Sequence, residues 1–334
     1  MATDHTRISL PRRAFRLYQK QGLKSLLYAI PHRLAWGYLE LLNNRKLPRS
    51  KDRYVLREIL GSNMYLDLDD KGISRDLLVD GIRERENVEV VKRQLHEGDI
   101  VIDVGANIGY YVLLEAKLVG EKGRVFAIEP VPHNYDLLTR NMQANRCQMV
   151  EAFQFAVGDK PGYAPIQIST HRNLCSIRLV DGYSERGLVK QQVDVEVRTL
   201  DSFLSDKPYP KLIRMDIEGY ESYAIKGLEK TLEAKLPLTI MLEFHFPFMK
   251  PEESLETLHR LKKANFEIVD IRRKQWMPGL SQHRLLERTI LSCEDGGANL
   301  PMFGNLELTI DQVLENKQIM SGEWGGLEIC FKRS

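Results

Sequence analysis

The stretch DIVIDVGANIGYY (99–111) decides the fold of this chain. Residues 99–104 are dominated by isoleucine and valine, which is typical of a strand buried on both faces of a sheet. Residues 105–109 hold two glycines that permit a tight turn, and a helix is expected over residues 110–118. A buried strand that turns directly into a helix indicates the first unit of an α/β fold.

The same alternation of strands and helices continues along the chain. Strands are predicted over residues 124–129, 150–157, 193–197, 212–217, 238–246, 266–271 and 327–331. Helices are predicted over residues 84–97, 132–145, 219–235 and 252–264, and a hairpin or short strands over residues 54–72. This order predicts a mainly parallel sheet with right-handed crossovers and with helices on both faces.

Composition places the chain among ordinary globular proteins. It has 334 residues, of which 43% are hydrophobic and 28% charged, so wholesale disorder is excluded. The four cysteines have no paired spacing, which argues against a zinc ribbon and against a disulfide framework. A reducing, cytoplasmic setting is therefore expected.

The N-terminal arm, residues 1–50, is basic and helical in character. Residues 1–60 carry 13 Lys and Arg against 4 Asp and Glu. Two amphipathic helices are predicted, over residues 12–29 and 32–43, and neither a membrane-spanning segment nor a secretory signal is indicated. Packing on the main domain with a solvated basic face is the favoured interpretation. The alternative is peripheral contact with an anionic membrane surface, at the inner membrane face, or with an anionic partner.

A ligand pocket is expected where the first two strands end. Gly105 and Gly109 allow the backbone to approach a ligand closely, and Glu129 can accept hydrogen bonds from the hydroxyls of a ribose. The glycine spacing is not the G-x-G-x-x-G of dinucleotide sites, and Asp103 would repel a pyrophosphate. A ligand with an ammonium group and no phosphate fits better, which points to S-adenosylmethionine. The alternative role of Asp103 is that of a turn or helix-capping residue.

Four further polar residues end the later strands: Asp216, Glu218, Glu243 and His245. Either His245 or Asp216 is expected to act as a general base, with Glu218 and Glu243 holding the base or the substrate. A divalent metal, Mg²⁺ or Mn²⁺, held by all four is the alternative. Structural roles also stay open, since Glu218 could cap a helix and His245 could be a buried strand residue.

An ordered set of motifs resembles the FkbM family of S-adenosylmethionine-dependent methyltransferases. The motifs are DVGANIGYY (103–111), IEP (128–130), AVGD (156–159), RTLDSF (198–203), MDIEGYE (215–221) and LEFH (242–245), preceded by a similar upstream stretch over residues 64–86. The resemblance covers roughly residues 60–270. It implies a class I methyltransferase fold, a Rossmann-like three-layer sandwich with a mostly parallel seven-stranded sheet. It also implies O-methyl transfer to a sugar, a glycan or another small hydroxylated acceptor.

The resemblance also implies roles for individual residues. Gly105, Asn107 and Gly109 would line the methionine portion of the cofactor, and Glu129 would hold its ribose. Pro130 would shape the next turn. Ala156, Val157 and Gly158 would flank the adenine. Glu84 stands where the family often has a glutamate, although Arg85 replaces the usual proline.

The expected organisation is a basic arm (1–50), a hairpin and helix (51–98), a methyltransferase domain (99–275) and an irregular C-terminal extension (276–334). Three other functions fit the sequence less well. An RNA methyltransferase would use the basic arm, but no recognised RNA module or Asn-Pro-Pro-Tyr-like motif is present, which disfavours nucleic acid. An inactive binding module would not need the glycine turn and the acids, and the glycine spacing disfavours a dehydrogenase.

Overall fold

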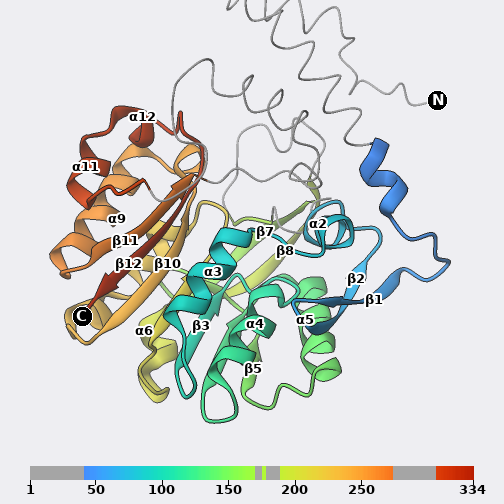
Figure 1. Ribbon diagram of the computed structural model, residues 1–334. Helices are drawn as coiled ribbons and strands as arrows, with labels where there is room; N and C mark the ends of the chain where they lie inside the picture. The colour runs from blue at the N-terminus through green and yellow to red at the C-terminus, as the bar shows by residue number, and fades with distance from the viewer. Residues whose placement is uncertain (1–40, 170–174, 178–188, 274–305) are drawn as a thin grey trace, which may run out of the picture.

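A seven-stranded sheet forms the centre of the computed structural model, which describes residues 41–169, 175–177, 189–273 and 306–334 (Figure 1). In spatial order its strands are β11 (Glu267–Arg273), β12 (Leu327–Arg333), β10 (Leu238–Phe244), β9 (Leu212–Met215), β3 (Ile100–Val104), β4 (Arg124–Ile128) and β5 (Val150–Phe153). Neighbouring strands from β10 to β5 are parallel, and β12 is antiparallel to both β10 and β11. The mostly parallel seven-stranded α/β sheet predicted from the sequence is confirmed.

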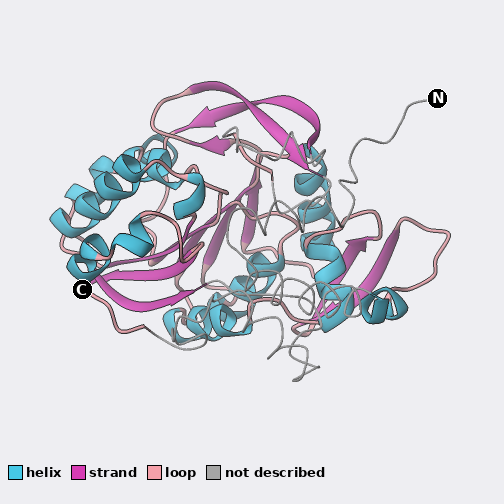
Figure 2. Cartoon of the chain, turned by 90° about the horizontal axis from the view of Figure 1, so that it is seen from above, coloured by secondary structure: helices cyan, strands magenta, loops and turns pink. Residues whose placement is uncertain are grey.

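Helices cover both faces of this sheet (Figure 2). One face carries α3 (Arg85–Gln94), α4 (Tyr110–Val119) and α5 (Pro132–Ala144); the other carries α6 (Leu200–Phe203), α7 (Glu221–Lys226), α8 (Glu229–Glu233), α9 (Pro251–Lys263), α11 (Ile310–Glu315) and α12 (Lys317–Met320). Side chains alternate along each strand, so Val101 belongs to the core under α4 and Ile102 to the core on the opposite face. Two apolar cores therefore enclose the sheet.

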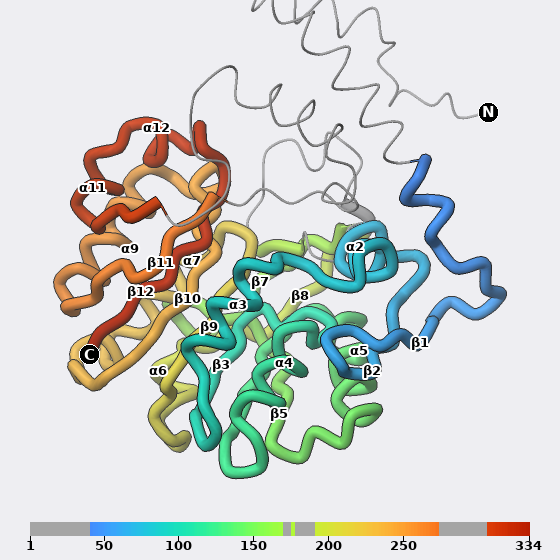
Figure 3. Tube along the Cα trace, viewed as in Figure 1, coloured from blue at the N-terminus to red at the C-terminus, as the bar shows by residue number. Residues whose placement is uncertain are grey.

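The predicted hairpin is present beside the α4–α5 face. It consists of β1 (Tyr54–Ile59) and β2 (Ser62–Asp67), paired antiparallel around a turn at Leu60 and Gly61. The tube in Figure 3 follows the chain from this hairpin through α2 (Ile73–Asp80) into α3. Residues that precede the main sheet in the sequence thus pack against it.

A smaller sheet corrects the prediction of one strand over residues 150–157. The chain leaves the main sheet after β5, and β6 (Ala156–Val157) pairs with β8 (Val189–Arg198), which also pairs with β7 (Gly162–Ser169). The helix predicted over residues 219–235 is also divided, into α7 and α8, around Gly227. A Cβ atom at Gly227 would lie 2.2 Å from the carbonyl oxygen of Gly158, so this close approach requires glycine.

The C-terminal prediction needs a further correction. Residues 327–333 form β12 inside the main sheet, between β10 and β11, so this part of the expected irregular extension belongs to the sheet. The reason is that the partners of β12 come from residues 238–273, which lie far from it in sequence. Most of the predicted basic arm, residues 1–40, lies outside the described residues. Among the described residues, no helix combines the length and the apolar character needed to cross a bilayer.

Candidate active site

A pocket opens at the carboxyl ends of β3, β4 and β9. In this type of sheet, ligands bind where the strand order reverses, which here is between β3 and β9. The pocket walls are Val104, Gly105, Asn107, residues 128–131, Asn134, residues 155–157, Ile166, residues 175–177, residues 216–218 and Tyr220. Segments from both sheets therefore contribute to one pocket.

The glycine bend, residues 105–109, forms one wall. Gly105 has a φ of 81°, and a Cβ atom there would lie 2.0 Å from the carbonyl oxygen of Asp216, so only glycine fits. Asn107 also lines the pocket. Gly109 does not, contrary to its predicted role beside the cofactor. It precedes α4 with a φ of 89° and packs against Leu138, so its role is to turn the chain into the helix.

Glu129 is a buried carboxylate that lines the pocket beside the glycine bend. Its Oε2 atom accepts a hydrogen bond from the backbone N–H of Asn107 at 2.8 Å, and its Oε1 atom accepts one from the N–H of Val131 at 2.9 Å. Burial raises the pKa of Glu129 to about 7, although these two hydrogen bonds oppose the shift. Each carboxylate oxygen can accept more than one hydrogen bond, so Glu129 can still receive hydroxyl donors from a ligand.

Asp103 lies away from the pocket, and its predicted contact with a cofactor ammonium group is not supported. Strand alternation points its side chain toward the α4 face, where it is fully buried. Its Oδ1 atom accepts a hydrogen bond from Arg214 Nη1 at 3.0 Å, and Arg214 also lies 3.4 Å from Asp216 Oδ2. The guanidinium carbon of Arg214 lies 3.8 Å from the centroid of the Tyr111 ring. Asp103 therefore helps to hold Arg214 beneath the pocket.

The residues expected around the adenine divide into two groups. Ala156 and Val157 line the pocket, as does Pro130 of the preceding turn. Gly158 does not line it. A Cβ atom at Gly158 would lie 2.8 Å from Val197 Cγ1 and 3.4 Å from Tyr220, so the missing side chain makes room for these neighbours.

The four predicted catalytic residues come together at the ends of β9 and β10, but only Asp216 and Glu218 reach the pocket. Their side chains are 17% and 8% exposed. Glu243 and His245 are buried behind them, with His245 Nε2 lying 3.4 Å from Glu218 Oε2. The arrangement therefore has an outer pair that a substrate could touch and an inner pair that it could not.

The environment of His245 contradicts its predicted role as a general base. Its Nδ1 atom lies 2.7 Å from Glu221 Oε1, and its Nε2 atom lies 2.8 Å from Glu243 Oε1. Burial alone would lower the pKa of His245, but the charges of Glu243, Glu218 and Glu221 outweigh burial and raise the pKa well above 6.5. An imidazolium that donates to carboxylates from both nitrogens has no lone pair for a substrate proton.

A metal ion would find its donors in a subset of the four residues. Asp216, Glu218 and His245 could each offer one ligand atom, all within 4.8 Å of one another. Glu243 instead groups with Glu84 and Glu328. Carboxylate oxygens with one imidazole nitrogen suit Mg²⁺ or Mn²⁺, but the contact between His245 and Glu243 would have to break first.

Sequence reasoning missed several members of this buried cluster. Glu221 holds His245 from α7, and Glu84 accepts a hydrogen bond from the Tyr111 hydroxyl at 2.9 Å. Arg83 Nη2 lies 3.0 Å from Glu84 Oε1. Only the family pattern points to Glu84 in the sequence. Its φ of 48° places it in a left-handed conformation before α3. Glu221 falls in the MDIEGYE motif, which was the available signal.

Comparison with known proteins places this site in a family. Residues 103–268 match the family model described as "Methyltransferase FkbM domain". The chain is 24% identical over 161 residues to "Hexuronic acid methyltransferase AglP" of Haloferax volcanii, covering 45% of this chain and 59% of that one. It is 28% identical over 166 residues to "Methyltransferase sdnD" of Sordaria araneosa, covering 41% of this chain and 62% of that one. The match thus spans about three fifths of the length of each relative.

The fold and the pocket together define a class I methyltransferase domain, and residues 103–268 are an FkbM methyltransferase domain. Among solved structures, the chain is similar to M. jannaschii TYW2 in complex with AdoMet. That match has 16% identity and a TM-score of 0.41, and it covers 86% of this chain and 90% of the other.

Proposed function

We propose that this protein transfers a methyl group from S-adenosylmethionine to a hydroxyl of a sugar, a glycan or another small hydroxylated acceptor. One observation carries the proposal: Glu129 is held by the backbone N–H groups of Asn107 and Val131 in the same pocket that Asp216 and Glu218 line. A fixed hydroxyl acceptor beside a close backbone bend suits a nucleoside without a diphosphate.

The residues present fit this cofactor. Glu129 would accept the ribose hydroxyls, while Ala156, Val157 and Ile166 offer an apolar wall to the adenine. Gly105 and Asn107 would line the methionine portion. When bound, the cofactor supplies an electrophilic methyl group, and the protein must position the acceptor oxygen and remove its proton.

Asp216 is the general base in this proposal. It lines the pocket, and Arg214 lies 3.4 Å from its Oδ2 atom, which favours the ionised carboxylate. The hydroxyl proton passes to Asp216 as the bond from the acceptor oxygen to the methyl carbon forms and the bond from sulfur to that carbon breaks. Glu218, also on the pocket wall, would hold the acceptor through another hydroxyl. His245 stabilises the carboxylates behind this pair and takes no proton.

A divalent metal bound by Asp216, Glu218 and His245 is the second way in which the hydroxyl could be activated. The ligand spacing supports this alternative, whereas the contact between His245 and Glu243 opposes it. We assign no step to a metal. A chelator distinguishes the two schemes, since only the metal scheme predicts lost turnover.

The sugar acceptor is supported by one relative, the hexuronic acid methyltransferase of Haloferax volcanii. The test is transfer of label from S-adenosylmethionine to hexuronic acid, neutral sugars, small alcohols and RNA, each with and without chelator. We expect labelled saccharide and no labelled RNA. Calorimetry that detects no S-adenosylmethionine binding would overturn the proposed reaction, and labelling of RNA alone would overturn the proposed acceptor.

A further inference from the structure

Asn141 of α5 and Asn145, the residue directly after α5, hold the hairpin in the same way. Asn145 accepts a hydrogen bond from the backbone N–H of Asn63 at 2.9 Å and donates one to its carbonyl at 2.7 Å. One helical turn earlier, Asn141 accepts from the N–H of Tyr65 at 2.7 Å and donates to its carbonyl at 3.4 Å. The edge of β2 that faces away from β1 is thus bound by side-chain amides in place of another strand.

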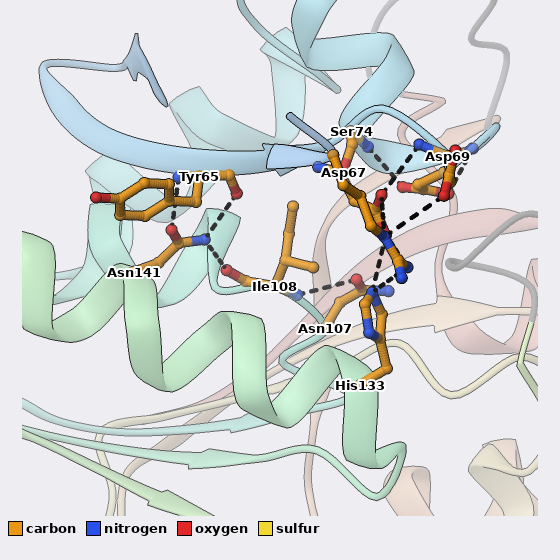
Figure 4. A network of polar contacts seen from close by, with 11 residues as sticks. Tyr65, Asp67, Asp69, Ser74, Asn107, Ile108, His133 and Asn141 are labelled. Atoms are coloured by element: carbon orange, nitrogen blue, oxygen red, sulfur yellow. Dashed lines mark hydrogen bonds and ion pairs between the residues drawn. The ribbon is translucent and has the colours of Figure 1, made fainter. Parts of the chain in front are cut away.

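Asn141 differs from Asn145 in one further contact. Its Nδ2 atom donates to the carbonyl of Ile108 at 2.8 Å, so a single buried amide joins the hairpin to the glycine bend (Figure 4). Within the described residues, none of the hydrogen bonds of the Asn145 side chain reaches the bend. The two residues therefore share the hairpin contact and differ in the contact with the pocket wall.

The bend is continuous with the cofactor site. The N–H of Ile108 donates to Asn107 Oδ1 at 2.9 Å, and the N–H of Asn107 donates to Glu129 Oε2 at 2.8 Å. Fixing the Ile108 carbonyl therefore restrains the short bend that also contains the 106–107 peptide unit, whose N–H binds Glu129. A buried amide that satisfies three backbone groups is costly to replace, because each group would be left without a partner.

We propose that Asn141 is a positioning residue for cofactor binding, and that the hairpin before the FkbM domain is part of the cofactor site through it. This inference rests on the proposed function. The hairpin sets the position of Asn141, Asn141 sets the glycine bend, and the bend sets the orientation of Glu129.

The experiment compares Asn141→Ala with Asn145→Ala as its matched control. Both variants lose a hairpin contact, so both should lower the midpoint of thermal unfolding. We expect the dissociation constant of S-adenosylmethionine, measured by calorimetry, to rise about tenfold in Asn141→Ala and to stay within about twofold in Asn145→Ala. In steady-state assays the KM for S-adenosylmethionine should rise while kcat at saturation changes little. Equal affinities in the two variants would overturn the inference.

A second variant keeps one of the three hydrogen bonds of Asn141. Asn141→Asp retains the volume and the acceptor for the Tyr65 N–H, but a carboxylate oxygen replaces the Nδ2 donor to the carbonyls of Ile108 and Tyr65. It should weaken cofactor binding at least as much as the alanine does, and it serves as the test variant if the alanine does not fold. Wild-type affinity in Asn141→Asp would overturn the inference.

Hydrogen exchange tests the same coupling without ligand. The peptide that contains residues 105–109 should exchange faster in Asn141→Ala than in Asn145→Ala, because only the former frees the bend. Equal exchange in the two variants would overturn the coupling. If the wild type binds no S-adenosylmethionine while the two variants differ in exchange as expected, the proposed function is overturned and the coupling between hairpin and bend stands.

Discussion

The Nδ1 atom of His245 lies 2.7 Å from the Oε1 atom of Glu221, and both side chains are buried. On its other side the imidazole meets Glu243 at 2.8 Å. This arrangement makes His245 a cation among carboxylates, and it moves the proton-accepting role in the proposed reaction to Asp216 on the pocket wall.

Replacing His245 should therefore destabilise the fold. His245→Ala leaves the carboxylates of Glu218, Glu221 and Glu243 without their shared cation, and breaking such a buried pair costs about 3–5 kcal/mol. The free energy of unfolding from urea titration measures the loss. His259→Ala, at an exposed position on α9, is the control and should change stability by less than about 0.5 kcal/mol. A His245→Ala protein as stable as the wild type would show that the imidazole carries no such charge.

Replacing Asp216 should abolish turnover while preserving cofactor binding. Asp216→Asn keeps the size of the side chain but cannot accept the hydroxyl proton, so we expect labelled methyl transfer to fall at least about a hundredfold. The dissociation constant of S-adenosylmethionine should stay within about threefold, since Glu129 and the glycine bend supply the binding contacts. Asp136→Asn, at an exposed position on α5, controls for the chemical change. Normal turnover by Asp216→Asn would exclude this residue as the base.

The stability of the protein without ligand should depend on the protonation of Glu129. The pKa of about 7 in the folded state lies above the ordinary value of 4.5, so folding favours the protonated carboxyl. This contribution is complete below pH 4.5 and is lost as the pH rises through 7, a change of about 3 kcal/mol. The free energy of unfolding is measured for the wild type and for Glu129→Gln across pH 5–8. The difference between the two pH profiles gives the contribution of Glu129, because the amide does not titrate. Parallel pH profiles for the two proteins would contradict the shift.

Cofactor affinity should show the opposite trend with pH. The ionised Glu129 is the better acceptor for ribose hydroxyls, so the affinity of the wild type for S-adenosylmethionine should rise as the pH passes through about 7. Glu129→Gln should bind about tenfold or more weakly at pH 8. Glu151→Gln, on the exposed side of β5, should bind like the wild type. Calorimetry at several pH values measures the dissociation constant of S-adenosylmethionine for each protein. A Glu129→Gln affinity equal to that of the wild type at pH 8 would show that Glu129 does not bind the cofactor.

Gly105→Ala should disrupt both the fold and the pocket. The new Cβ atom would meet the Asp216 carbonyl oxygen at 2.0 Å, on a backbone whose φ is 81°. Strain and overpacking together should cost about 3 kcal/mol or more. Gly162→Ala is the control, because nothing lies within 4 Å of a Cβ atom there. Thermal unfolding of both variants tests this, and a stable Gly105→Ala protein would contradict the packing.

Much of the fold was predictable because its signals are local. The apolar run over residues 99–104, the glycine bend after it and the alternation of strands and helices indicated a parallel sheet with its pocket at the strand ends. The position of Glu129 in the pocket follows in the same way, from its place at the end of the second strand. The β5–β6 break was not, because residues 150–157 read as one apolar strand and only pairing with β8 divides them.

The sequence by itself determined the class of fold, the glycine bend and the acids that surround the pocket. Only the tertiary structure decided which acids face a ligand. Asp103 pairs with Arg214 because β3 and β9 are neighbours in register, and His245 is charged because α7, β9 and β10 bring three carboxylates around it. The physical reason is the distance along the chain over which each effect acts. Backbone preference depends on a few adjacent residues. The partners, burial and pKa of a side chain depend on groups that only the assembled sheet brings within a few ångströms.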